Sequence, residues 1–182
     1  YLTLAFAPGE CAQIDWGTAG LLPIGNLSRR LYFFVMVLCY SRLLYVEFTV
    51  SESMEQFLTG HRHAFEFFGG VPEKVMIDNL KVGVLRHPCG EPALFHPRYL
   101  DLAAHYGFRP VACAVRKGNE KGRVESGVAY VKKNFLNGLD LPSFAALQPA
   151  AIQWRDTVAN IRVHGETHRQ PIDLFAEEKP RL

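Results

Sequence analysis

Residues 31–40 read LYFFVMVLCY, an apolar run that leaves no position for a solvent-facing side chain. A strand that is apolar on both faces is typical of the middle of a sheet. Residues 41–42 predict a tight turn, and residues 43–50 (LLYVEFTV) return as a second strand. The two runs should therefore form an antiparallel hairpin, with residues 31–40 in the middle of a sheet.

Shorter strands are predicted on both sides of this hairpin. Residues 10–16 (ECAQIDW) alternate in polarity, with Asp15 on the same face as Gln13, and Gly17 ends the strand. The turn-rich stretch that follows could include an edge strand, because Pro23 cannot donate a hydrogen bond within a central one. Two more short strands are predicted, at residues 74–77 and 108–115.

Helices are predicted where apolar residues recur every three or four positions between capping residues. They cover residues 51–68, 97–105, 118–135 and 143–161. Residues 81–96 are interpreted as a surface loop, and those from Arg162 onward as irregular. The order of elements predicts an α/β fold, a mixed five-stranded sheet with helices on both faces. We expect a core over residues 1–140, with a C-terminal helix and tail (141–182) packing on it or extending from it.

Composition excludes several classes of protein. The 182 residues are 48% hydrophobic, which is too apolar for a disordered chain. The longest apolar run is half of the roughly 20 residues that span a bilayer, so no membrane partner is expected. Four cysteines without C-x-x-C spacing disfavour a zinc module or a disulfide framework, and indicate a reducing cytoplasm.

The net charge of +2 is small, but basic residues concentrate between residues 116 and 135. Two acidic residues in this stretch, Glu120 and Glu125, are outnumbered by the basic ones. A local basic surface is a modest sign of phosphate binding. The basic residues are Arg116, Lys117, Lys121, Arg123, Lys132 and Lys133.

Asp15 and Asp78 each follow an apolar strand. Taken alone, Asp15 could bond its own turn and Asp78 could cap a helix. If the first and fourth strands lie side by side and parallel, however, both carboxylates meet at one edge of the sheet. Two adjacent carboxylates repel unless a cation lies between them, and Mg²⁺ is the natural partner for oxygen ligands.

Glu125 could supply a third oxygen ligand from the basic helix. On that helix Lys121 lies four residues earlier, so an ordinary ion pair is the simplest reading of Glu125 alone. When the two aspartates are considered as well, we interpret Glu125 instead as a metal ligand, flanked by lysines that bind phosphate.

Five segments, in order along the chain, resemble the catalytic domain of DDE transposases of the retroviral-integrase superfamily, above all the IstA-type insertion-sequence enzymes. They are residues 13–17 (QIDWG), 64–72 (AFEFFGGVP), 77–81 (IDNLK), 121–125 (KGRVE) and 160–164 (NIRVH). The resemblance implies an RNase H-like fold and a catalytic triad of Asp15, Asp78 and Glu125. It also implies two Mg²⁺ or Mn²⁺ ions, cleavage of transposon ends and transfer of the 3′-hydroxyl into target DNA.

In this scheme Asp15 would bridge the two ions, and Asp78 and Glu125 would bind one each. The resemblance further implies double-stranded DNA as substrate, a homo-oligomer on DNA, an IstB-type AAA+ helper ATPase, and a bacterial, nucleoid-associated location. Candidate DNA contacts are Lys81, Lys121, Arg123, Lys132, Lys133 and Arg162. Asn160 and His164 could also touch phosphates, although a solvated tail explains them equally well.

One spacing departs from the retroviral enzymes. The 46 residues between Asp78 and Glu125 are more than those enzymes have, and we assign the excess to the loop at residues 81–96. Two other functions stay open: an RNase H-like nuclease or resolvase that only hydrolyses DNA, and an inactive DNA-binding or assembly module. His61 and His63 face different sides of a helix, so they make a poor metal pair, and His61 is expected in the packed core.

Overall fold

The computed structural model describes residues 5–78, 82–88, 90–113, 122–139 and 143–182, without the side chains of residue 24 and residues 122–125. Five strands form a mixed sheet in the order β3-β2-β1-β4-β7. β1 pairs antiparallel with β2, and β2 with β3, whereas β1–β4 and β4–β7 are parallel. The strands are β1 (Cys11–Ile24), β2 (Leu27–Leu38), β3 (Leu44–Thr49), β4 (Lys74–Ile77) and β7 (Arg109–Ala112).

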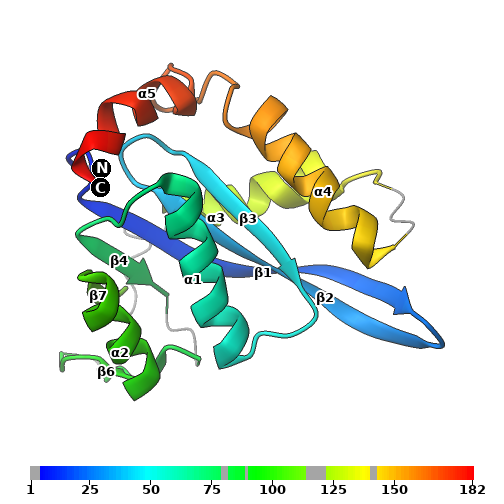
Figure 1. Ribbon diagram of the computed structural model, residues 1–182, viewed down its shortest axis with the longest axis horizontal. Coiled ribbons are helices and arrows are strands. Elements are labelled where there is room, and N and C mark those ends of the chain that lie inside the picture. Colours follow the sequence, from blue (N-terminus) through cyan, green and yellow to red (C-terminus); the bar gives the residue numbers. More distant parts are fainter. Residues whose placement is uncertain (1–4, 79–81, 89, 114–121, 140–142) are drawn as a thin grey trace.

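Helices cover both faces of this sheet, as predicted (Figure 1). One face carries α1 (Met54–Phe68) and α2 (Pro97–Tyr106). The other carries α3 (Gly122–Tyr130) with its π-helical continuation η2 (Val131–Leu136), and α4 (Phe144–Trp154) with η3 (Arg155–Ala159). Among the described residues, no helix is long and apolar enough to cross a membrane.

The predicted helix ends are confirmed where capping residues marked them. Ser53 caps α1, its hydroxyl accepting from the Gln56 backbone N–H, and Gly69 ends the helix in the left-handed conformation at φ 70°. Pro97 opens α2, and Ser143 caps α4.

The first strand is longer than predicted. β1 does not stop at Gly17 but continues to Ile24, so the stretch interpreted as turn-rich forms the outer part of a long hairpin with β2. Gly17 lies inside the strand because the Phe33 ring covers it: a Cβ there would lie 2.0 Å from the ring. The glycine therefore marks a close approach of a side chain and not the end of the strand.

Two further expectations were wrong. Residues 81–96 contain a small hairpin, β5 (Val84–Arg86) with β6 (Leu94–Phe95), and are not simply a loop. The segment after Arg162 is not irregular throughout, because it contains α5 (Pro171–Glu178) and the short 3₁₀ helix η4 (Lys179–Arg181).

The buried carboxylate of Glu178 holds α5 in place, accepting hydrogen bonds from the backbone N–H groups of Gly9 (3.1 Å) and Ser41 (3.1 Å). The described C-terminal residues thus pack against the sheet, through Leu147 and Trp154 on one face and Phe175 on the other. The domain boundary at residue 140 stays a prediction.

Candidate active site

Asp15 and Asp78 are brought together by the pairing of β1 with β4. The parallel register runs from Cys11 beside Lys74 to Ile14 beside Ile77, so the next residue on each strand is an aspartate. Neighbouring strands lie about 4.8 Å apart, which places the two backbones within reach of a shared ligand. The structure thus meets the condition of the sequence argument, that the first and fourth strands lie side by side and parallel.

Both aspartates lie towards the face of the sheet opposite α1. Ile14 and Trp16 pack in the core beneath α1, and the alternating residue Gln13 donates from Nε2 to Met76 Sδ (3.5 Å) on the other face. Asp15 and Asp78 continue that second row, and both are half-buried.

The carboxylate of Asp15 also makes a local bond. Its Oδ1 accepts a hydrogen bond from the backbone N–H of Trp16 (2.8 Å), the local role that the sequence left open for this residue. A carboxylate has about four lone-pair directions, so this one bond does not by itself exclude a role as a metal ligand.

The helix that carries Glu125 crosses the same face. At Gly127 on α3, a Cβ would lie 3.0 Å from Val37 Cγ2 and 3.4 Å from Val35 Cγ1. Val35 is the cross-strand partner of Asp15, so the glycine lets α3 approach the sheet beside this aspartate. Glu125 lies two residues before Gly127; its side chain is outside the described residues, and its role as third ligand stays a prediction.

The candidate DNA contacts have different surroundings. Lys132 and Lys133 are exposed on η2. Arg162 is half-buried, with its guanidinium 3.8 Å from the centre of the Tyr130 ring and one N–H donating to the Ala159 carbonyl. Lys81, Lys121 and the side chain of Arg123 lie outside the described residues. None of these contacts with DNA is tested, and they stay predictions.

Asn160 is structural, so the sequence interpretation of this residue was wrong. It is 3% exposed, and its amide bonds both backbone groups of Leu44: Oδ1 accepts from the N–H and Nδ2 donates to the carbonyl, each at 2.9 Å. The side chain thus makes the same two hydrogen bonds with Leu44 that a neighbouring strand would make, and it connects the end of η3 to β3.

Beside α3 the structure reveals a basic pocket that the sequence did not indicate. Arg42, in a left-handed conformation (φ 65°), pairs through Nη2 with Glu166 Oε2 at 2.9 Å. Burial, together with the charges of Arg162 and Arg42, lowers the pKa of His164. The pocket is lined by Val37, Arg42, Leu44, Ser126, Gly127, Arg162, His164 and Glu166. Arg42 is distant in sequence from Arg162 and His164, which is why the sequence did not indicate that they line one pocket.

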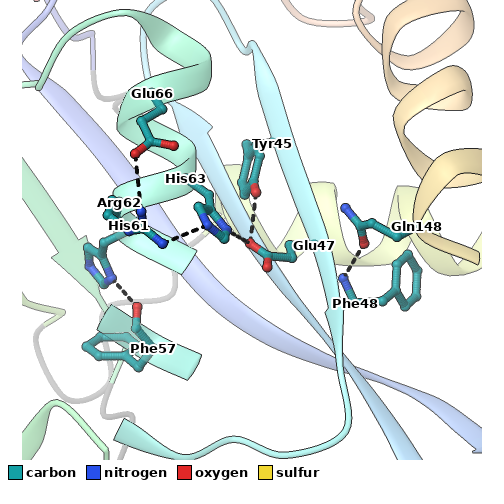
Figure 2. A network of polar contacts seen from close by, with 9 residues as sticks. All are labelled: Tyr45, Glu47, Phe48, Phe57, His61, Arg62, His63, Glu66 and Gln148. Atoms are coloured by element: carbon teal, nitrogen blue, oxygen red, sulfur yellow. Dashed lines mark hydrogen bonds and ion pairs between the residues drawn. The ribbon is translucent and has the colours of Figure 1, made fainter. Parts of the chain in front are cut away.

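A second group of ionisable side chains lies under α1, on the opposite face (Figure 2). Glu47 Oε2 accepts from the Tyr45 hydroxyl (2.8 Å) and contacts His63 Nδ1 (2.9 Å). His61 is fully buried and bonds the Phe57 carbonyl through Nδ1 (2.7 Å), and burial lowers its pKa to about 4. The prediction that His61 belongs to the core is confirmed.

Metal binding by this group is not supported. Among the side chains that the structure describes, no set of three or more His, Cys, Asp or Glu residues is arranged to hold a metal ion. The group therefore joins α1 to β3, and the aspartate pair remains the candidate site.

Comparison with known proteins identifies relatives of this arrangement. The family model of the integrase core domain matches residues 6–118. A putative transposase for insertion sequence element IS5376 from Geobacillus stearothermophilus is 34% identical over 171 residues, covering 94% of this chain and 42% of the relative. A transposase for an IS21-like insertion sequence element from Bacteroides fragilis is 34% identical over 175 residues, 96% of this chain and 34% of that protein. The chain thus spans less than half the length of these relatives.

A solved structure shares the fold. The HTLV-2 integrase catalytic core domain in complex with magnesium (trimeric form) has a TM-score of 0.62 and 16% identity to this chain, and the match covers 92% of this chain and 97% of that one. The predicted RNase H-like fold is confirmed.

Proposed function

Because this chain belongs to the integrase core domain family, we propose that it is the catalytic domain of an insertion-sequence transposase that cuts the ends of its element and joins them to target DNA. The names of the similar transposases support this proposal. We also propose that the substrate is double-stranded DNA, and that the chain acts in a homo-oligomer with an IstB-type AAA+ ATPase as helper.

One observation carries the proposal. In the parallel register of β1 with β4, Ile14 pairs with Ile77, and Asp15 and Asp78 are the residues that follow them. Strand ends in open α/β sheets are where functional side chains gather. α3 packs on the same face through Gly127, which supports a position for Glu125 near the aspartates. The three acids would then converge from two strands and a helix.

The donor set fits a hard divalent cation. Asp15 and Asp78 offer only carboxylate oxygens, the ligands that Mg²⁺ and Mn²⁺ prefer, and Glu125 would add a third. Two such ions, when bound, would activate a water or 3′-hydroxyl nucleophile and stabilise the charge on the leaving oxygen. Asp15, Asp78 and Glu125 would hold the ions, and no covalent bond between protein and DNA would be required.

A strand-joining assay tests the proposal. Duplexes carrying the ends of the element are incubated with target plasmid, Mg²⁺ and the chain, or its D15N, D78N or E125Q variant. Each variant should lower joining by at least about 100-fold, the scale on which loss of one charge-stabilising group slows an enzyme. Asp101→Asn, at an exposed position on α2, is the matched control and should join like the wild type.

The products separate the rival functions. Joined products support the proposal, nicks without joining favour a hydrolytic nuclease or resolvase, and DNA binding without either favours an inactive assembly module. An active E125Q variant would remove Glu125 from the triad.

A further inference from the structure

The β1–β2 hairpin extends beyond the rest of the sheet as a two-stranded arm, defined here as residues 20–31 (Figure 1). β3 pairs with β2 as far as Tyr32 beside Thr49, whereas β1 and β2 continue pairing from Gly20–Leu31 to Ile24–Leu27. At about 3.3 Å per residue, these further pairs carry the arm roughly 16 Å past the third strand.

The arm is anchored at its base and narrow at its tip. Leu22 and Leu31 are 2% and 1% exposed and belong to the hydrophobic cluster that packs under α4. A two-residue turn, Gly25–Asn26, closes the tip, with Gly25 at φ 60°. The arm is therefore held in one direction, which lowers the entropic cost of binding a partner.

All charged side chains of the arm are basic. No Asp or Glu occurs between residues 16 and 46, and the arm carries Arg29 and Arg30, both exposed. Asn26 and Ser28, also exposed, add neutral polar groups near the tip. Glu52, after β3, is close enough to Arg30 for the two charges to interact, but the arm itself has positive charges, polar groups and no Asp or Glu, which makes it complementary to a polyanion.

The arm also lies on the same strand as the candidate site, beginning at Gly20, five residues after Asp15. β1 runs from Asp15 directly into the arm, which leaves the sheet at the edge where Asp15 and Asp78 lie. A two-stranded β-ribbon fits the major groove of B-DNA, about 12 Å wide. We propose that the arm is a DNA-binding element, in which Arg29 and Arg30 contact phosphates of the duplex beside the cleavage site. This inference rests on the proposed function.

Contact with a second copy of the chain is the main competing use of the arm. Leu21 and Leu27 are 70% and 63% exposed. Leu21 pairs with Arg30, and Leu27 lies three residues before Arg30 on the same strand, so the two leucines lie on opposite faces of the arm. The two exposed leucines therefore do not share one patch, and the charge favours DNA.

The test measures DNA affinity separately from chemistry. Binding of a fluorescent duplex is followed by anisotropy in EDTA at several salt concentrations, for the wild type and an R29A/R30A double variant. The variant should bind at least about 10-fold more weakly, and its slope of log K against log salt should fall by about 2, one for each lost phosphate contact. An R29K/R30K variant should retain most of the affinity, because lysine preserves the charge.

The matched control is R62A/R98A, which removes two half-exposed arginines from α1 and α2 and should leave the slope unchanged. If R29A/R30A binds like the wild type while the wild type still joins DNA, this inference fails and the proposed function stands. If the wild type neither binds nor joins DNA, both fail. If L21S/L27S dissociates an oligomer while R29A/R30A binds DNA normally, the arm is a contact between copies of the chain.

Discussion

The two faces of the central sheet carry ionisable groups of opposite character. Under α1, the carboxylate of Glu47 bonds both Tyr45 and His63, which lie within 16 residues of it in the sequence (Figure 2). His61 bonds the helix backbone. On the other face, Asp15 and Asp78 come from strands far apart in sequence and meet through a parallel register.

The difference distinguishes polar residues that stabilise the fold from polar residues that form the candidate site. The bonds from Glu47 to Tyr45 and His63 fasten a helix to a strand and so stabilise the fold, while the buried His61 bonds through Nδ1 only and its Nε2 has no hydrogen-bond partner among the described atoms. The aspartate pair places two acidic residues at the ends of neighbouring parallel strands, an arrangement that a bound cation would stabilise. The structural network therefore joins residues that are close in sequence, whereas the candidate site depends on the pairing of two strands that are far apart in sequence.

Gly127→Leu should have the largest effect of the substitutions considered for this comparison. The new side chain would meet Val37 and Val35 and push α3 away from the sheet. We expect at least about a 100-fold loss of strand joining, since a displacement near 1 Å can cost that much. Overpacking should also lower the free energy of unfolding by about 1–3 kcal/mol.

Gly165→Ala is the control, because a Cβ there has no neighbour within 4 Å among the described atoms. Joining is measured below the melting temperature of both variants. Normal joining by the folded Gly127→Leu protein would show that the approach of α3 does not position the site.

Much of this arrangement was predictable from local patterns. Alternation placed Asp15 on the face opposite Ile14, and capping residues such as Ser53 marked helix ends, because these signals depend on neighbours in sequence. The hydrophobic run at residues 31–40 also placed β2 inside the sheet, whereas the parallel pairing of β1 with β4 was a condition of the sequence argument that the structure meets.

What escaped prediction depends on tertiary contacts. Gly17 resembled a strand end until the Phe33 ring was found above it, so the arm was missed. Pro23 is tolerated because β1 pairs with β2 alone there, its pairing with β4 having ended at Ile14. α5 was hidden in a polar segment whose anchor, Glu178, binds backbone groups of residues 9 and 41.

His61 should make the α1 face sensitive to acid. Its pKa in the folded protein, about 4, lies below its ordinary value of 6.5, so the unfolded chain binds the proton more readily. The stability contributed by neutral His61 is thus fully present above pH 6.5 and is lost as the pH falls towards 4, by up to about 3 kcal/mol.

Urea unfolding at pH 7, 5.5 and 4.5 checks this effect, and His61→Leu should flatten the dependence. The same substitution at His105, exposed on α2, controls for the loss of a histidine. An unchanged dependence in His61→Leu would place the acid sensitivity elsewhere.

Asn160→Ala should lower the free energy of unfolding by about 2 kcal/mol, because the N–H and carbonyl of Leu44 would lose their partners in a buried place. Thermal unfolding measures the loss. Joining at low temperature should be unaffected, and a specific loss of joining or DNA binding by the folded variant would return Asn160 to the functional surface.

Glu47→Gln should have the smallest effect. The amide keeps the size of the side chain and an oxygen for the Tyr45 hydroxyl, so the free energy of unfolding should change by under about 1 kcal/mol. Joining should stay within about twofold of the wild type. A large loss of joining would erase the functional distinction between the two faces.

A crystal structure of the chain soaked in Mn²⁺, recorded with anomalous scattering, tests the central claim most directly. The account predicts an anomalous peak between the carboxylates of Asp15 and Asp78, with a Glu125 oxygen among its ligands. A well-ordered site without a peak, or with Glu125 directed away from both aspartates, would contradict it.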